Sequence, residues 1–312
     1  MFIENAFVNQ NYFWKYLLGS LMVIAATFAG QVPITVAMLF AAFQQKKPLT
    51  SLNTQALMGL LDKNLNLFLL LFSFVVGLLA LFYVIKKLHQ QTILEVTTSR
   101  KSIDWRRIFF SFIVWSIFSI VSVYASYLLM PQDFVLNFQL IPFLILFFIA
   151  VVFIPFQTSL EEYIFRGYLM QGFGLLAKNK WFPLIMTSII FGTMHIVNPE
   201  VEKLGYIILV YYIATGLLLG MMTLMDDGME LALGFHAANN LVGCLLVTSD
   251  WSVLQTYSIL KDISEPSLGL SIFVPVAVVY PLLLVVFAIK YKWSNWQEKL
   301  TGKINFVLPN KF

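Results

Sequence analysis

Long apolar runs follow one another along most of the chain, and short polar segments separate them. About 20 residues of helix cross the hydrocarbon of a bilayer, so an apolar run near 18 residues or longer is a candidate transmembrane helix. The runs cover residues 16–43, 65–85, 108–130, 138–177, 182–197, 205–225, 229–247 and 270–289. This pattern predicts an all-α, polytopic membrane protein with about eight transmembrane helices.

The composition agrees with this prediction and narrows the classes of function. Hydrophobic residues make up 59% of the 312 residues and charged residues only 12%, whereas soluble domains have roughly 45–50% and 25%. So little charge cannot solvate a globular surface of this size, which excludes an ordinary soluble enzyme, a disordered chain and a nucleic-acid-binding protein. The single cysteine, Cys244, excludes a disulfide framework and a cysteine-rich metal site.

The distribution of basic residues indicates the orientation. If the N-terminus lies inside and the spans alternate, about three quarters of the Lys and Arg residues fall on the inside. The positive-inside rule then predicts that both termini are cytoplasmic. Asp226 and Asp227 fall on the same side, but acids contribute little to this rule. The first run is too long for the apolar part of a typical signal peptide and is expected to be a span, and the compact loops suggest a bacterial plasma membrane.

Neither an internal repeat nor a linker divides the chain, so the expected organisation follows the candidate chemistry. Residues 1–130 are expected to form N-terminal transmembrane helices, residues 131–250 a catalytic core from the fourth to seventh spans, and residues 251–312 a last helix and a cytoplasmic tail. The longest polar insert is 86–107. A solvated loop is favoured there over contact with anionic lipid headgroups, and His89 within it is expected to be solvated.

Ionisable residues inside the predicted spans are the strongest pointer to function. Each costs about 2.5–3.5 kcal/mol near the centre of a span on insertion scales, so its default interpretation is functional. The spacing of Glu162 and Arg166 places both on one helix face, where they can pair, while Glu161 is rotated from Glu162 by about 100°. One acid can thus be neutralised while the other stays reactive.

Two histidines occupy later spans. His195 lies 16 residues after Asn179 and Glu161 lies 18 residues before it, so the two lie at depths that differ by about 3 Å in an antiparallel helix pair. His236 and Asn240 are four residues apart and project from one face. The depth match requires that the helix continue beyond Pro155, since a helix that ended there would place Glu161 at the cytoplasmic surface.

Three short motifs then occur in order, with Glu161, Glu162 and Arg166 in the first, Phe191 and His195 in the second, and His236 and Asn240 in the third. Together they resemble the motifs of the CPBP family (CAAX protease and bacteriocin-processing, also called Abi) of intramembrane endopeptidases, which includes the type II CAAX prenyl proteases. The resemblance implies hydrolysis of a peptide bond within the membrane. It also implies that Glu161 and His195 activate water, that His236 and Asn240 stabilise the oxyanion, and that Glu162 and Arg166 hold the geometry.

Metal dependence stays open at this point. No cofactor is assigned, with a slight preference for metal-free catalysis, but Glu161, His195 and His236 could also form a His₂Glu zinc set with an open water position. The expected partners are the lipid bilayer and a membrane-embedded or lipid-anchored peptide substrate, as in CAAX-type processing or bacteriocin or pheromone maturation, and no nucleic acid. Two rival functions are a non-catalytic bacteriocin-immunity or scaffold protein and, less favoured, a proton-coupled transporter.

Overall fold

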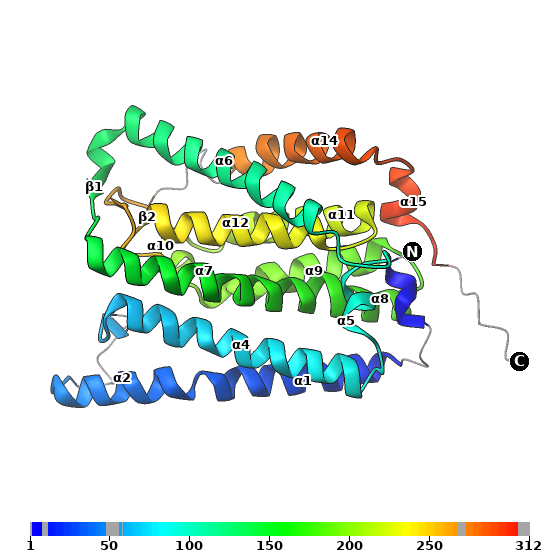
Figure 1. The fold of residues 1–312 in the computed structure, drawn as a ribbon, viewed down its shortest axis with the longest axis horizontal. Helices are drawn as coiled ribbons and strands as arrows, with labels where there is room; N and C mark the ends of the chain where they lie inside the picture. Colours follow the sequence, from blue (N-terminus) through cyan, green and yellow to red (C-terminus); the bar gives the residue numbers. More distant parts are fainter. Residues whose placement is uncertain (1, 8–11, 48–55, 58, 267–272, 305–312) are drawn as a thin grey trace, which may run out of the picture.

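The computed structural model describes residues 2–7, 12–47, 56–57, 59–266 and 273–304, and the arrangement of its helices is shown in Figure 1. The helices are α1 (Phe13–Gly30), α2 (Val32–Gln44), α4 (Lys63–Lys87), α5 (Ile93–Thr97), α6 (Trp105–Leu129), α7 (Leu140–Glu162), α8 (Met170–Ala177), α9 (Trp181–Met194), α10 (Pro199–Leu204), α11 (Ile208–Asp226), α12 (Glu230–Leu246), α14 (Tyr280–Tyr291) and α15 (Trp296–Thr301). Short 3₁₀ or π segments are η1 (Ile3–Phe7), η3 (Pro131–Asp133), η4 (Tyr163–Leu169), η5 (His195–Val197) and η6 (Pro275–Val279).

The predicted fold class is confirmed: the chain is an all-α, polytopic membrane protein. Each of the eight predicted apolar runs is helical over most of its described residues. Five helical stretches of the described chain are long and apolar enough to cross a membrane, while the helices at 181–197 and 275–291 are apolar but shorter. The five stretches are Phe13–Gln44, Lys63–Lys87, Trp105–Leu129, Leu140–Ala177 and Ile208–Asp226.

The long helices pack side by side in the order α1, α4, α7, α12 and α6. Helices α9 and α11 pack against each other behind this row (Figure 1), and α11 also contacts α12 and α14. The largest hydrophobic cluster joins α1, α4, the η4 segment, α11 and α12, with Leu81, Leu219 and Phe235 among its most buried members. The central helices α7 and α12, which carry most of the candidate site, are therefore covered on both sides.

The stretch Leu140–Ala177 continues through Pro155, as the depth argument requires. A proline lacks the N–H that would bond the carbonyl four residues earlier, but neighbouring helices can compensate in a membrane bundle. The α-helix α7 ends at Glu162, seven residues after Pro155, and continues as η4, a π-helical segment, before α8 resumes the α-helical form. Glu161 lies 21 residues after Leu140 and 16 before Ala177, which places it near the middle of the stretch.

A small sheet lies at the end of the bundle opposite η1 and α15 (Figure 1). Its strands are β1 (Phe134–Leu136), β2 (Val247–Thr248) and β3 (Leu260–Asp262), in the order β1-β3-β2. Strand β3 pairs antiparallel with β1 and parallel with β2. The sheet ties the connections before α7 and after α12 together, so it fixes the ends of the two helices that bear the site.

The prediction that His89 is solvated is wrong. Its side chain is fully buried, its Nε2 lies 2.8 Å from the Tyr168 hydroxyl, and its ring lies 4.3 Å from that of Tyr16. Local polarity of the 86–107 segment misled the prediction, because the residues that bury His89 lie far away in the sequence.

Asp226 and Asp227, which fall on the side where basic residues predominate, are both paired with basic side chains. Arg100 pairs with both Asp226 and Glu230, at 3.0 and 3.1 Å, and Arg107 pairs with Asp226. Asp227 is paired with Lys299 of α15. The acids at this end are therefore neutralised by basic residues of neighbouring segments.

Candidate active site

The two adjacent acids have different surroundings. Glu162 is completely buried, and its Oε1 accepts hydrogen bonds from Arg166 Nη1 at 2.9 Å and from His236 Nδ1 at 2.7 Å. Arg166 is also fully buried and donates from Nη2 to the carbonyl oxygen of Gly216 at 3.2 Å. The predicted pairing of Glu162 with Arg166 is confirmed, and the pair joins the start of η4 to both α11 and α12.

Glu161 points to a less enclosed region. The relative solvent exposure of its side chain is 16%. Its Oε1 accepts a hydrogen bond from the side-chain amide of Gln157. Its Oε2 lies 3.7 Å from His236 Nε2. The rotation of about 100° between neighbouring helical residues therefore separates a sealed acid, Glu162, from a partly accessible one, Glu161.

His236 lies between the two acids. The Glu162 carboxylate can only accept, so His236 Nδ1 carries the hydrogen of that bond. Its Nε2 consequently faces Glu161 Oε2 and, at 3.5 Å, Asn240 Nδ2. Asn240 in turn donates from Nδ2 to Gln157 Oε1 at 3.0 Å. The shared face expected for His236 and Asn240 is present in α12.

His195 approaches the site from the end of α9, where the helix tightens into η5. Its Nδ1 donates to the carbonyl oxygen of Phe191 at 2.7 Å, which leaves Nε2 available as an acceptor. The His195 ring stacks on Tyr212, with ring centroids 4.2 Å apart and planes inclined by 19°. Both contacts fix the orientation of the imidazole.

Phe191 brings the three motifs together. Its ring centroid lies 4.8 Å from that of His195 and 6.1 Å from that of His236, and the Arg166 guanidinium carbon lies 4.3 Å from the ring centre. The six predicted site residues thus converge where α7, η4, α9 and α12 meet. Glu162, Arg166 and His236 are buried, whereas Glu161, His195 and Asn240 are half-buried, so the second group is better placed to meet a substrate and water.

Sequence reasoning missed two residues of this region. Gln157 bridges Glu161 and Asn240, and Tyr212 covers one face of His195. Gln157 had a detectable signal, because it is a polar residue inside an apolar span and one helical turn before Glu161. Tyr212 had none, since an aromatic residue in a span is ordinary.

Glu161, His195 and His236 carry the donor atoms that a zinc site would use. Within the described ranges, no three His, Cys, Asp or Glu side chains gather as a metal-binding group. His236 Nδ1 is engaged by Glu162, and His195 Nδ1 by a backbone carbonyl. These bonds leave both Nε2 atoms free, as in metal-bound histidines, but Glu161, His195 and His236 are not gathered as a three-ligand set in the described structure.

Residues 137–242 match the family model described as "Type II CAAX prenyl endopeptidase Rce1-like". All six predicted site residues lie within that range. This part of the chain is therefore similar to that family of type II CAAX prenyl endopeptidases. An integral membrane protease is the kind of function that this similarity supports.

A curated relative of this chain comes from a bacterium. It is "Uncharacterized protein YyaK" from Bacillus subtilis (strain 168), which is 29% identical over 255 residues, covering 80% of this chain and 84% of the relative. The similarity to this relative therefore extends well beyond residues 137–242 into the flanking helices. No solved structure matches the chain.

Proposed function

We propose that this protein is a glutamate-type intramembrane endopeptidase that hydrolyses a peptide bond in a membrane-associated protein or peptide. One observation carries the proposal: Glu161, His236 and Asn240 meet within hydrogen-bonding or near-contact distance in the middle of a long apolar helix bundle. Ionisable groups at such depth are costly and are retained for function. The family match supports the same class of reaction.

In the proposed reaction Glu161 and His195 activate the attacking water. Glu161 accepts one proton from the water while the water oxygen bonds to the scissile carbonyl carbon. His195 Nε2 accepts a hydrogen bond from the water and so orients it. The C–N bond then breaks, and Glu161 returns the proton to the leaving amine. A carboxylate in reach of the water and shielded from bulk solvent is suited to this general-base role.

In this proposal His236 and Asn240 stabilise the negative charge that develops on the carbonyl oxygen. Asn240 has two amide hydrogens and uses one on Gln157, so the other can be donated to the oxyanion. One such donor contributes about 2.7–4 kcal/mol to transition-state stabilisation in well-studied proteases. With Glu161, Glu162 and Arg166 charged, a proton on His236 makes the set neutral, which limits the cost of burying it.

Glu162 and Arg166 have a positioning role in this proposal. Glu162 holds His236 through Nδ1, and Arg166 holds Glu162 while it contacts the backbone of α11 and the ring of Phe191. We propose that no metal takes part, because the site residues do not fit a three-ligand set. We further propose a plasma-membrane location with both termini cytoplasmic, which follows from the positive-inside pattern.

The test compares membrane proteomes of cells that carry the wild type or Glu161→Gln at equal expression. The proposal predicts at least one membrane-associated precursor that accumulates uncleaved in the variant, with a new N- or C-terminus found only in the wild type. A Glu202→Gln variant, altered in an acid of α10 outside the site, is the matched control and should behave as the wild type. Identical terminal peptides in wild type and Glu161→Gln would contradict proteolysis.

A further inference from the structure

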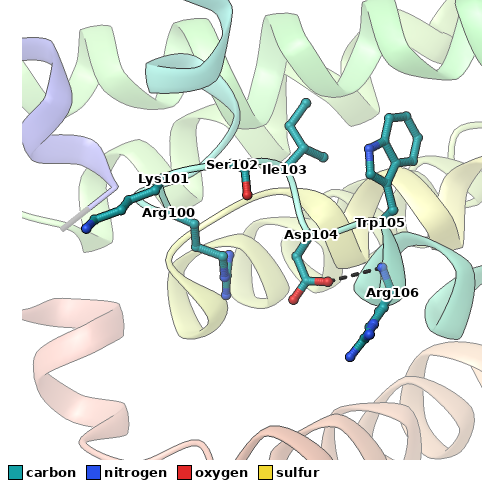
Figure 2. A pocket seen from close by; sticks show the side chains of 7 residues that line it. All are labelled: Arg100, Lys101, Ser102, Ile103, Asp104, Trp105 and Arg106. Carbon is teal, nitrogen blue, oxygen red and sulfur yellow. Dashed lines mark hydrogen bonds between the residues drawn. The ribbon is translucent and has the colours of Figure 1, made fainter.

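A shallow pocket lies in the connection between α5 and α6, at the end of the bundle that holds η1 and α15 (Figures 1 and 2). Its volume is about 460 Å³. It takes no part in the candidate active site. The lining residues are Arg100, Lys101, Ser102, Ile103, Asp104 and the first two residues of α6, Trp105 and Arg106.

Ion pairs hold the loop against the bundle, and two cationic side chains of the loop, Lys101 and Arg106, take no part in them. Arg100 is engaged by Asp226 and Glu230, and Asp104 accepts from the Arg106 backbone N–H and pairs with Arg107. Lys101 and Arg106 are exposed. Within the part of the chain that the structure describes, neither makes an ion pair, so the pocket keeps a positive surplus.

The backbone of the loop adds hydrogen-bond donors. Among the described residues, the amide N–H groups of Lys101, Ser102 and Ile103 have no protein acceptor, while those on either side are bonded, Arg100 N–H to Thr98 Oγ1 and Asp104 N–H to Glu230 Oε1. Consecutive free amide groups beside cationic side chains favour an anionic oxygen ligand.

An apolar stripe runs away from the pocket along α6. Trp105, Phe109, Ile113 and Ile117 are each more than half exposed and follow at four-residue intervals, so each lies beside the next in a stripe that winds slowly around the helix. Figure 2 shows Arg100, Asp104 and Arg106 on one side of the loop and Trp105 on the other. The loop thus separates a basic side from an apolar side, as at the boundary between headgroups and acyl chains.

We propose that this pocket binds an anionic phospholipid of the surrounding leaflet. The headgroup phosphate contacts Arg106 and the free amides of the loop, Lys101 adds positive charge at the other end of the loop (Figure 2), and an acyl chain lies along the Trp105–Ile117 stripe. A soluble phosphate compound could pair with the basic side chains of the pocket but would make no contact with the apolar stripe. A zwitterionic lipid could place an acyl chain along the stripe, but its headgroup has no net negative charge to match the pocket. Because the basic pocket continues directly into the apolar stripe, an anionic lipid matches both. This inference does not depend on the proposed protease activity.

The test measures lipid binding by native mass spectrometry on delipidated, detergent-purified full-length protein. The probes are phosphatidylglycerol, phosphatidylcholine with the same acyl chains, and glycerol phosphate. The variants are Lys101→Gln/Arg106→Gln and a matched control, Lys86→Gln/Lys87→Gln, which removes two exposed cations at the same end of the bundle. The site variant should bind phosphatidylglycerol about tenfold more weakly, and the control variant less than twofold more weakly.

Three results would overturn the proposal. Equal weakening in the two double variants would mean diffuse attraction to a basic surface. Equal affinity of the wild type for phosphatidylcholine and phosphatidylglycerol would show that the negative charge of the headgroup does not contribute to binding. Displacement of the lipid by glycerol phosphate at matched concentration would make the pocket a soluble-anion site. If the double variant is not monodisperse, Lys101→Gln alone carries the same comparison against Lys86→Gln.

Discussion

The Oε1 atom of Glu162 and the Nδ1 atom of His236 lie 2.7 Å apart, although the two residues are 74 positions apart in the sequence. This bond fixes the imidazole so that Nε2 faces Glu161 and Asn240. The arrangement assigns different roles to two neighbouring acids. Glu162 orients a histidine from a sealed position, and Glu161 stays accessible for chemistry.

Substitution of these acids should therefore separate catalysis from folding. Glu161→Gln keeps the shape and the bond from Gln157, so we expect a normal yield of folded protein and loss of cleavage by at least a hundredfold. Glu162→Gln removes the charge that faces Arg166 and should lower the thermal unfolding temperature as well as activity. Yield after size-exclusion chromatography and cleavage of an identified precursor are the two measurements. Reduced yield in Glu161→Gln with normal yield in Glu162→Gln would reverse the assignment.

Arg166 should matter for folding more than for chemistry. Arg166→Ala leaves the buried Glu162 carboxylate without its cation, and breaking a buried pair in this way costs about 3–5 kcal/mol. We expect a several-fold lower yield of monodisperse protein. The double variant Glu162→Gln/Arg166→Met removes both charges and should recover much of that yield while it stays inactive. Normal yield and activity of Arg166→Ala would contradict the pairing argument.

The sequence predicted the helices well because lipid imposes a minimum apolar length on each span. It also predicted the Glu162–Arg166 pair, since helical spacing alone sets that contact. It could not predict which helix face points inward, because lipid-exposed and buried faces are equally apolar in membrane helices. The bonds that join Gln157 to Asn240 and Glu162 to His236 depend on those rotations and became visible only in the structure.

The errors have a similar origin. His89 lies in a polar segment, but its partner Tyr168 is 79 positions away, so local polarity gave the wrong exposure. The three strands, each of two or three residues, are too short to leave a sequence pattern. Both features depend on contacts between distant segments, which no window along one sequence contains.

Gln157 should act as a positioning residue for Glu161 and Asn240. Gln157→Met retains the length of the side chain and removes both hydrogen bonds, so we expect a ten- to hundredfold lower kcat with little change in KM. A purely structural role would instead lower the folded yield and leave the kcat of the remaining folded protein unchanged.

His89 should make the stability of the protein depend on pH. Burial, together with the positive charge of Lys15, lowers the pKa of His89 to about 4, whereas an unfolded histidine titrates near 6.5. Between these values the unfolded chain binds more protons, so the free energy of unfolding falls as the pH falls. We expect the unfolding temperature to decrease from pH 7.5 to pH 5 more in the wild type than in His89→Gln. Equal decreases in the two proteins would exclude His89 as the source.

Gly216 of α11 should be intolerant of even one added methyl group. A Cβ atom there would lie 2.9 Å from the Cα of Ser188 and 3.0 Å from its carbonyl oxygen, both backbone atoms of α9. Gly216→Ala should therefore force α9 and α11 apart and destabilise the protein by about 1–3 kcal/mol. It should also reduce activity, because the Gly216 carbonyl accepts a hydrogen bond from Arg166.

Gly243 of α12 offers the matched control for this prediction. A Cβ atom at Gly243 meets nothing within 4 Å, so Gly243→Ala should gain only the higher helix propensity of alanine, up to about 1 kcal/mol. Thermal unfolding of both variants in the same detergent gives the comparison. The unfolding temperature should fall for Gly216→Ala and stay equal or rise for Gly243→Ala. If both variants shift in the same direction by the same amount, close packing of α9 on α11 does not determine the stability of this part of the bundle.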